Sequence, residues 1–245
     1  MCQIKVKMGF VKGEVPLRTG SRTGSAVKVP VRGWPSLWLR IGYWACIVIA
    51  VAAVVRRVLA LAYPPRSVAP QVAGLDALFA SHAALTLAHI LPALAFVLVT
   101  PFFVLRRSEK TAWAERLLFP LGAVVGLTAY AMTSVASVGG WTERSAILFF
   151  NTLFLFELFR AWRYWQRGES ALKRRWMLRA IIVLLGIATT RPVVGLFFAT
   201  SPLTHLTPSQ FFGVAFWIGF SINTVVVELW LRSRDRSRSN ADMDR

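Results

Sequence analysis

Six apolar stretches, each long enough to form a helix of about 20 residues, dominate this chain of 245 residues. The stretches cover residues 37–63, 78–105, 117–137, 145–162, 176–198 and 208–231. A helix satisfies its own backbone hydrogen bonds, so it can cross the hydrocarbon core of a bilayer. We therefore predict an all-α fold, a six-helix transmembrane bundle, within a membrane domain that spans residues 37–231.

Basic residues between the apolar stretches predict the orientation of the helices. With both termini in the cytoplasm, 24 of the 29 Lys and Arg residues lie on the cytoplasmic side. The positive-inside rule therefore favours an N-in, C-in topology. Eight of the ten tryptophans lie near the same predicted boundaries, as in an aromatic belt. The five basic residues left on the other side are Arg56, Arg57, Arg66, Arg144 and Arg191.

The composition agrees with a membrane protein and excludes other classes. The chain is 56% hydrophobic and only 16% charged, which makes disorder or a soluble globular fold a poor description. Its net charge of +18 sits in short blocks, so we expect contacts with anionic lipids at the cytoplasmic face. We expect no nucleic-acid binding. These features predict a multi-pass membrane protein.

The two termini differ from the apolar domain. Residues 1–36 are basic and rich in Gly, Ser and Thr, and we expect a disordered cytoplasmic tail with no cleavable signal peptide. Residues 232–245 alternate Arg, Ser and Asp, and we expect a second disordered cytoplasmic tail. Cys2 and Cys46 lie in different environments and predict no disulfide framework.

Four polar residues fall at one predicted depth, in the outer half of the bundle. They are His89, Tyr130, Asn151 and Arg191, each on a different predicted helix. Polar residues at membrane depth often mark a site, although they can also simply hydrogen-bond helices together. No acidic residue shares the predicted depth of Arg191, so its guanidinium could bind an anionic ligand or snorkel to the lipid headgroups. These four residues are our candidate ligand-binding site.

A second polar layer lies nearer the cytoplasm and is best explained as structural. Glu157 and Arg160 are three positions apart, a spacing that allows an ion pair on one helix face. Glu228 has Arg179 or the Arg174–Arg175 block as candidate partners. The layer comprises Glu157, Arg160, Arg179, Asn223 and Glu228.

The chain contains three histidines: His82, His89 and His205. His82 and His89 are seven positions apart on one predicted helix, about 10.5 Å along its axis, so they cannot ligate the same haem iron. His205 precedes the last stretch and is a conceivable partner for His82. We expect no resident cofactor, and haem b is the alternative that these histidines leave open.

Residues in the last third of the chain follow a distinctive order. They are Arg174, Arg175, Trp176, Met177, Leu178, Arg179, Thr190, Arg191, Trp217, Asn223 and Glu228. This order resembles that of the bacterial membrane proteins grouped as domain of unknown function 2306. Gly139–Gly140 also looks similar, and the resemblance covers roughly residues 78–232. It implies a fold, a polar framework and a place in the bacterial cytoplasmic (inner) membrane, but no activity. Two histidine positions of the family are absent, in Ala114–Leu118 and at Leu172–Lys173.

Three functional hypotheses follow from these observations. The first is a membrane protein that binds or moves a small anionic molecule. Its polar pocket would be the candidate ligand-binding site in the outer half of the bundle. The second is a membrane redox protein that holds haem or quinone with His82 or His89. The third is a structural or assembly subunit. No motif of nucleophilic, phosphate-binding or metal-dependent catalysis occurs, and an enzymatic activity stays undecided.

Overall fold

The computed structural model describes residues 37–63, 70–105 and 112–243, and every regular element in these ranges is an α-helix. The expected tail of residues 1–36 lies outside them. The helices are α1 (Leu37–Ala62), α2 (Pro70–Ser81), α3 (Ala83–Leu105), α4 (Ala112–Val135), α5 (Gly140–Gln166), α6 (Ser170–Leu184), α7 (Gly186–Thr204) and α8 (Pro208–Met243).

Within the described residues, six helical segments are long and apolar enough to cross a membrane. Five are α1, α3, α4, α5 and α8, and the sixth is α6 together with α7. Many of their large apolar side chains point outward, such as Trp38, Leu127, Phe149 and Leu229. A soluble monomer rarely exposes apolar surface on this scale, whereas lipid covers it without cost. The predicted all-helical fold is therefore confirmed, and the chain has the build of a multi-pass membrane protein.

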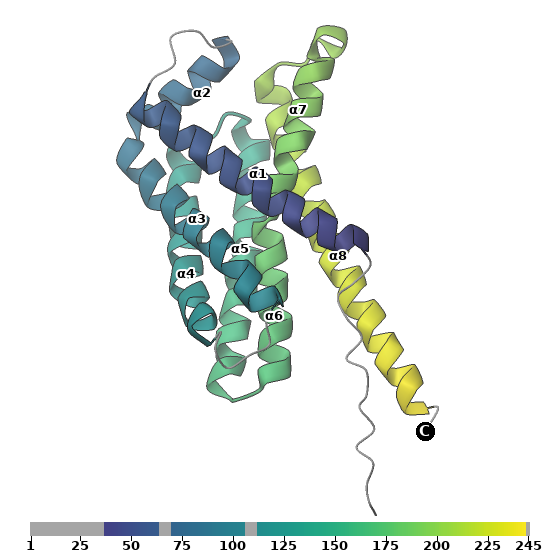
Figure 1. Ribbon diagram of the computed structural model, residues 1–245. Coiled ribbons are helices and arrows are strands. Elements are labelled where there is room, and N and C mark those ends of the chain that lie inside the picture. The colour runs from purple at the N-terminus through teal and green to yellow at the C-terminus, as the bar shows by residue number, and fades with distance from the viewer. Residues whose placement is uncertain (1–36, 64–69, 106–111, 244–245) are drawn as a thin grey trace, which may run out of the picture. The chain divides into compact units, whose positions relative to one another are not determined.

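Helix α5 occupies a central position and packs against α4, α6 and α8. Helix α3 packs against α4, and α7 packs against α8. Helix α1 crosses this group at a steep angle and contacts α3 and α7 (Figure 1). The α4–α5 and α7–α8 connections lie at one end of the bundle, and the α5–α6 connection lies at the other (Figure 1).

Glycines allow the closest helix contacts. A Cβ atom at Gly219 of α8 would lie 2.7 Å from the backbone nitrogen of Thr190 in α7. Gly122 and Gly126 of α4 are four positions apart and face Leu158 and Leu155 of α5. Small residues at this spacing are typical of helix interfaces in membranes, because they let the backbones approach.

Two expected helices are interrupted. The second apolar stretch contains the end of α2 and all of α3, which are separated at His82. The fifth contains the C-terminal part of α6 and most of α7, which are separated at Leu185. Gly186 follows this break and lies directly against Phe220 of α8, where a Cβ atom would clash with the ring. The second break is therefore tied to packing between distant parts of the chain.

Helix α8 continues to Met243, so the expected disordered tail of residues 232–245 is helical through most of its length. A bidentate ion pair between Arg175 of α6 and Asp235 of α8 helps to hold the extension. The start of α8 agrees with the sequence pattern. The backbone N–H of Thr207 donates to Gln210 Oε1 at 2.9 Å, as in a capping box.

Candidate functional site

A cavity of about 360 Å³ lies inside the bundle. All eight helices contribute residues to its wall, and α1 closes one side with Ala50, Ala53 and Val54. A volume of this size is within the range of small-molecule sites. The cavity is therefore the first place to look for a ligand.

One end of the cavity is lined by charged side chains, and we call it the charged end. Its members are Arg56 and Arg57 of α1, Glu143 of α5 and Arg191 of α7. The other end, the apolar end, is lined by Val97, Val125, Phe154, Val183 and Leu184. The lining residues of α3 run from Thr86 to Val97, eleven positions or about 16 Å along the helix axis.

Arg56 and Arg57 share one carboxylate at the charged end. Arg57 Nη1 lies 2.5 Å from Asp76 Oδ1, and Arg56 Nη2 lies 3.1 Å from Asp76 Oδ2. The guanidinium of Arg57 also stacks over Phe79, 4.1 Å from the ring centroid. The side chain of Arg56 is 51% exposed, so the charged end reaches the surface of the molecule. Helix α2 thus holds both arginines in place through Asp76 and Phe79.

Arg191 has no such partner. Among the described residues it makes no hydrogen bond and no ion pair, although Arg56, Arg57 and Glu143 are within electrostatic range. Arg191 is an exposed residue, and its side chain forms part of the cavity wall. Three guanidinium groups therefore face two carboxylates, Asp76 and Glu143, which leaves one positive charge in excess.

Glu143 is a member of the charged end that the sequence reasoning missed. Its Oε2 accepts backbone hydrogen bonds from Val138 at 2.7 Å and from Gly139 at 2.5 Å. The expectation that no acidic residue shares the depth of Arg191 is therefore wrong. Helix α5 begins at Gly140 rather than at residue 145, and this earlier start brings Glu143 into the bundle. An acidic residue three positions after Gly140 was the available signal, since carboxylates favour the first turn of a helix.

His89 and Asn151 line the cavity between its two ends, and both are held by α4. His89 Nδ1 is 2.9 Å from Thr128 Oγ1. Asn151 Nδ2 donates to the carbonyl oxygen of Gly126 at 2.9 Å. The structure thus brings together three of the four residues of the predicted site: His89, Asn151 and Arg191.

Tyr130 is the fourth predicted residue, and it is not part of the cavity wall. Its hydroxyl group pairs with Thr152 Oγ1 at 2.8 Å, between α4 and α5. Tyr130 shares the predicted depth of the other three but lies on a different face of α4. Its role in the structure is a contact between helices.

The other two histidines lie apart from the cavity wall. His82 separates α2 from α3, and its Nδ1 is 2.9 Å from Ser81 Oγ. His205 is an exposed residue that ends α7 in the left-handed conformation, with φ of 53°. His89 is the histidine that the described cavity contains.

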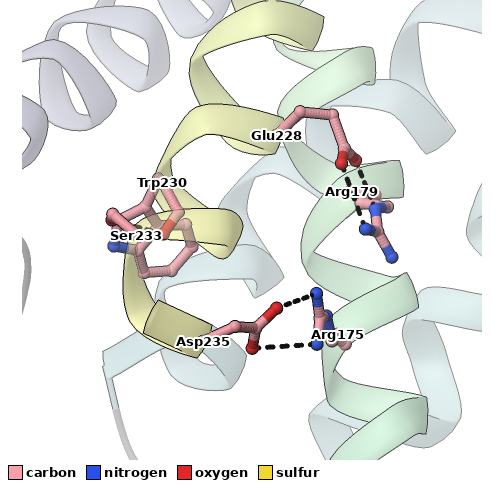
Figure 2. A network of polar contacts seen from close by, with 6 residues as sticks. All are labelled: Arg175, Arg179, Glu228, Trp230, Ser233 and Asp235. Atoms are coloured by element: carbon pink, nitrogen blue, oxygen red, sulfur yellow. Dashed lines mark hydrogen bonds and ion pairs between the residues drawn. The ribbon is translucent and has the colours of Figure 1, made fainter. Parts of the chain in front are cut away.

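Two members of the second polar layer, Arg179 of α6 and Glu228 of α8, form an ion pair between these helices (Figure 2). Arg179 is one of the two partners expected for the Glu228 carboxylate. Four positions earlier on α6, Arg175 donates to both carboxylate oxygens of Asp235, at 3.0 and 2.6 Å. Figure 2 shows the two pairs stacked along facing sides of the helices. Arg174 instead donates to the last carbonyl groups of α3, at Phe103 and Val104.

Asn223 connects α8 to α6 and α7. Its Nδ2 donates to the carbonyl oxygen of Ile182 at 2.9 Å, and its Oδ1 accepts from Thr189 at 2.7 Å. Both ends of the amide are used within the bundle. Asn223 therefore fits the structural layer to which it was assigned.

The expected ion pair between Glu157 and Arg160 is not formed. Arg160 Nη2 donates to Tyr164 Oη at 2.9 Å, and its guanidinium lies 4.9 Å from the ring centroid of Trp176. Its side chain thus extends along α5 toward Tyr164 and away from Glu157. The Oε2 atom of Glu157 and the Nε atom of Arg160 are both buried without a hydrogen-bond partner among the described residues.

The arrangement places cationic groups at one end of the chamber and apolar side chains at the other, with His89 and Asn151 between them. Such a chamber can orient a ligand by one ionic contact and enclose the remainder by apolar contacts. A comparison of the chain with models of protein families, with curated proteins and with solved structures found no match. The candidate site is therefore interpreted from its own residues.

Proposed function

We propose that this chain is a multi-pass protein of the bacterial inner membrane that binds a small anionic molecule in the cavity. One observation carries the proposal: three arginines converge on the charged end, and Arg191 has no ionic partner among the described residues. A guanidinium binds a carboxylate or phosphate through charge-assisted hydrogen bonds, often two at once, and Arg191 has none of these bonds within the described residues. An anion at this end balances the excess positive charge.

The positions of the arginines support the same conclusion. Under the proposed N-in, C-in topology, only five basic residues lie on the non-cytoplasmic side. Three of them, Arg56, Arg57 and Arg191, line the cavity. The exceptions to the positive-inside rule are thus concentrated at one site. Topology alone gives no reason for this, whereas an anion-binding site does.

The resemblance to domain of unknown function 2306 agrees with this framework. Arg191, Asn223 and Glu228 are among the residues that carry the resemblance. Asn223 and Glu228 hold α8 to its neighbours, and Arg191 faces the cavity. We propose that the family shares the contacts by which Asn223 and Glu228 hold α8 to its neighbours. We propose that Arg191 is the residue of this set that binds the ligand.

The proposal is tested by ligand-dependent stabilisation. The protein is placed in nanodiscs of zwitterionic lipid, and its melting temperature is measured with octanoate and with uncharged octanol. A ligand at ten times its Kd stabilises the folded state by about 1.4 kcal/mol. We expect octanoate, at such an excess, to raise the melting temperature by several degrees and octanol to have little effect. Arg191→Ala should abolish the octanoate effect.

Arg144→Ala is the matched control for this experiment. Arg144 directly follows Glu143, bonds to Ser137 Oγ at 2.7 Å and is not part of the cavity wall. Both variants remove one arginine from the same side of the predicted topology, but only Arg191→Ala removes it from the cavity. Equal shifts in Arg191→Ala and the parent protein would contradict the proposed site.

A redox role is the second candidate, because His89 and Asn151 line the cavity below the charged end. Polar groups at this position suit the carbonyl oxygens of a quinone. This candidate predicts quinone that co-purifies with the parent protein and is lost in His89→Ala. For haem b, it predicts a Soret band in protein produced with haem available, with an α band on reduction. Retained anion binding in His89→Ala would favour the first candidate.

A further inference from the structure

We infer that the ligand of this cavity is a single-chain amphiphile with an anionic headgroup, its head at the arginines and its chain in the apolar end. The inference rests on the proposed anion site and specifies the class of molecule that the site accepts. It is carried by the gradient of chemistry along the cavity, which is a separate observation from the convergence of the arginines.

The gradient follows the same direction along three paths through the helices. On α3 the lining residues change from Thr86 and His89 to Val97. On α5 they change from Glu143 to Phe154, and on α7 and α6 from Arg191 to Val183. Each of these paths runs from the charged end into the bundle. A small hydrated anion would fill only the charged end. It has no apolar part that could occupy the apolar end.

The apolar end is a poor place for water or for a polar ligand. Apolar cavities of this kind stay dry, because a water molecule needs two to four polar partners. Val97, Phe154, Val183 and Leu184 offer none through their side chains. An alkyl or isoprenoid chain would make favourable contacts with the same walls.

The dimensions of the cavity also fit an elongated molecule. Its lining extends for eleven positions on α3 and on α5, which is about 16 Å along each axis. The volume of about 360 Å³ spread over this length describes a narrow chamber. One chain fits such a chamber better than a bulky ring system or the paired chains of a diacyl lipid.

The test is a chain-length series on the full protein in nanodiscs of zwitterionic lipid. Dissociation constants, relative to free aqueous ligand, are measured for acetate, octanoate and dodecanoate, and for dodecanol. Each methylene group that the cavity buries should lower the Kd about fourfold. Dodecanol should bind more weakly than dodecanoate, and only the acids should lose affinity in Arg191→Ala.

Two tryptophan variants of α3 separate the cavity from the surrounding bilayer, into which long chains also partition. Leu94 lines the cavity, whereas Leu98, one turn further on, is exposed on the outside of the bundle. Leu94→Trp should remove the gain with chain length and leave the weak binding of acetate. Leu98→Trp should behave like the parent protein.

A photochemical experiment on the unmodified protein gives an answer even where Leu94→Trp fails to fold. Dodecanoate with a diazirine at its chain end should label Val97, Phe154 or Leu184. Labelling only of outward residues such as Leu98 and Phe156, or equal chain-length gains in both tryptophan variants, would overturn the inference.

Two further outcomes separate the inference from the proposed function. Binding of acetate as tight as that of dodecanoate, with loss in Arg191→Ala, would overturn the amphiphile and leave the anion site standing. The absence of any Arg191-dependent binding throughout the series would overturn both.

Discussion

Glu157 is a buried acidic residue with an unsatisfied carboxylate oxygen in the interior of the bundle. Only 4% of the residue is exposed, and its Oε2 atom has no hydrogen-bond partner among the described residues. The nearby ion pair of Arg179 and Glu228 is already complete within itself. A buried polar atom without a partner costs about 1–3 kcal/mol. Glu157 is therefore a residue whose presence packing does not explain.

Replacement of Glu157 by Leu should stabilise the protein. The change keeps a similar side-chain volume and removes the unsatisfied carboxylate, so we expect the melting temperature to rise by at least about 2 °C. Glu228→Leu is the control, because it removes the partner of Arg179 and should lower the melting temperature. A lower melting temperature for Glu157→Leu would show that its carboxylate makes a stabilising contact in the folded protein.

At the same scale, the site shows which residues a sequence can predict. The rise per residue of a helix gives depth, and this placed His89, Asn151 and Arg191 at a common level. The direction of each side chain depends on helix packing, which is why Tyr130 was grouped with them. Glu143 and the Arg56–Arg57 pair were missed because they lie near helix ends, where depth is hardest to estimate.

At the scale of the helices, apolar length decided most of the fold. Each predicted stretch corresponds to a spanning segment, because about 20 apolar residues have few alternatives to a transmembrane helix. The breaks at His82 and Leu185 were not predicted. The second break depends on contact between Gly186 and Phe220, which are 34 positions apart. A local pattern holds no information about such a contact.

Three glycine-to-alanine variants should test the helix contacts. Gly219→Ala places a Cβ against the backbone of Thr190, which cannot move alone, so we expect a loss of about 1–3 kcal/mol. In Gly126→Ala the atoms nearest the new Cβ belong to the side chain of Leu155, which can change rotamer, so this variant should cost less. Gly195 has open space where a Cβ would lie, and Gly195→Ala should be neutral or stabilising by up to about 1 kcal/mol.

Unfolding in mixed micelles with increasing denaturing detergent measures these differences. The order of stability should be Gly195→Ala, then Gly126→Ala, then Gly219→Ala. A Gly219→Ala protein as stable as Gly195→Ala would mean that α7 and α8 can separate without penalty. The close packing would then have no energetic importance.

At the scale of the whole molecule, charge and lipid contact act together. The outward faces of α1, α4, α5 and α8 carry large apolar side chains, while ion pairs join α6 to α8 near the C-terminal part of the bundle. The basic residues are distributed so unequally that one orientation is strongly favoured. Under this orientation the charged end of the cavity faces away from the cytoplasm.

Reporter fusions in a bacterial host test the orientation. Green fluorescent protein fused after Arg245 should fluoresce, and alkaline phosphatase fused there should be inactive. Alkaline phosphatase inserted after Gly139, in the α4–α5 connection, should be active. The reverse pattern would place the charged end of the cavity in the cytoplasm and would contradict the N-in, C-in topology.

Helix α1 is both a wall of the cavity and a lipid-facing surface. Ala50 and Ala53 line the chamber, while Val48 and Val55 are exposed on the outside. A single helix therefore separates the chamber from the bilayer. An amphiphile dissolved in that bilayer has already buried its chain and lost part of its freedom to move. Passage of such an amphiphile past α1 would exchange one apolar surrounding for another, and the arginines would supply the preference for the cavity. Occupancy would then follow the mole fraction of anionic amphiphiles in the membrane, rather than their concentration in water.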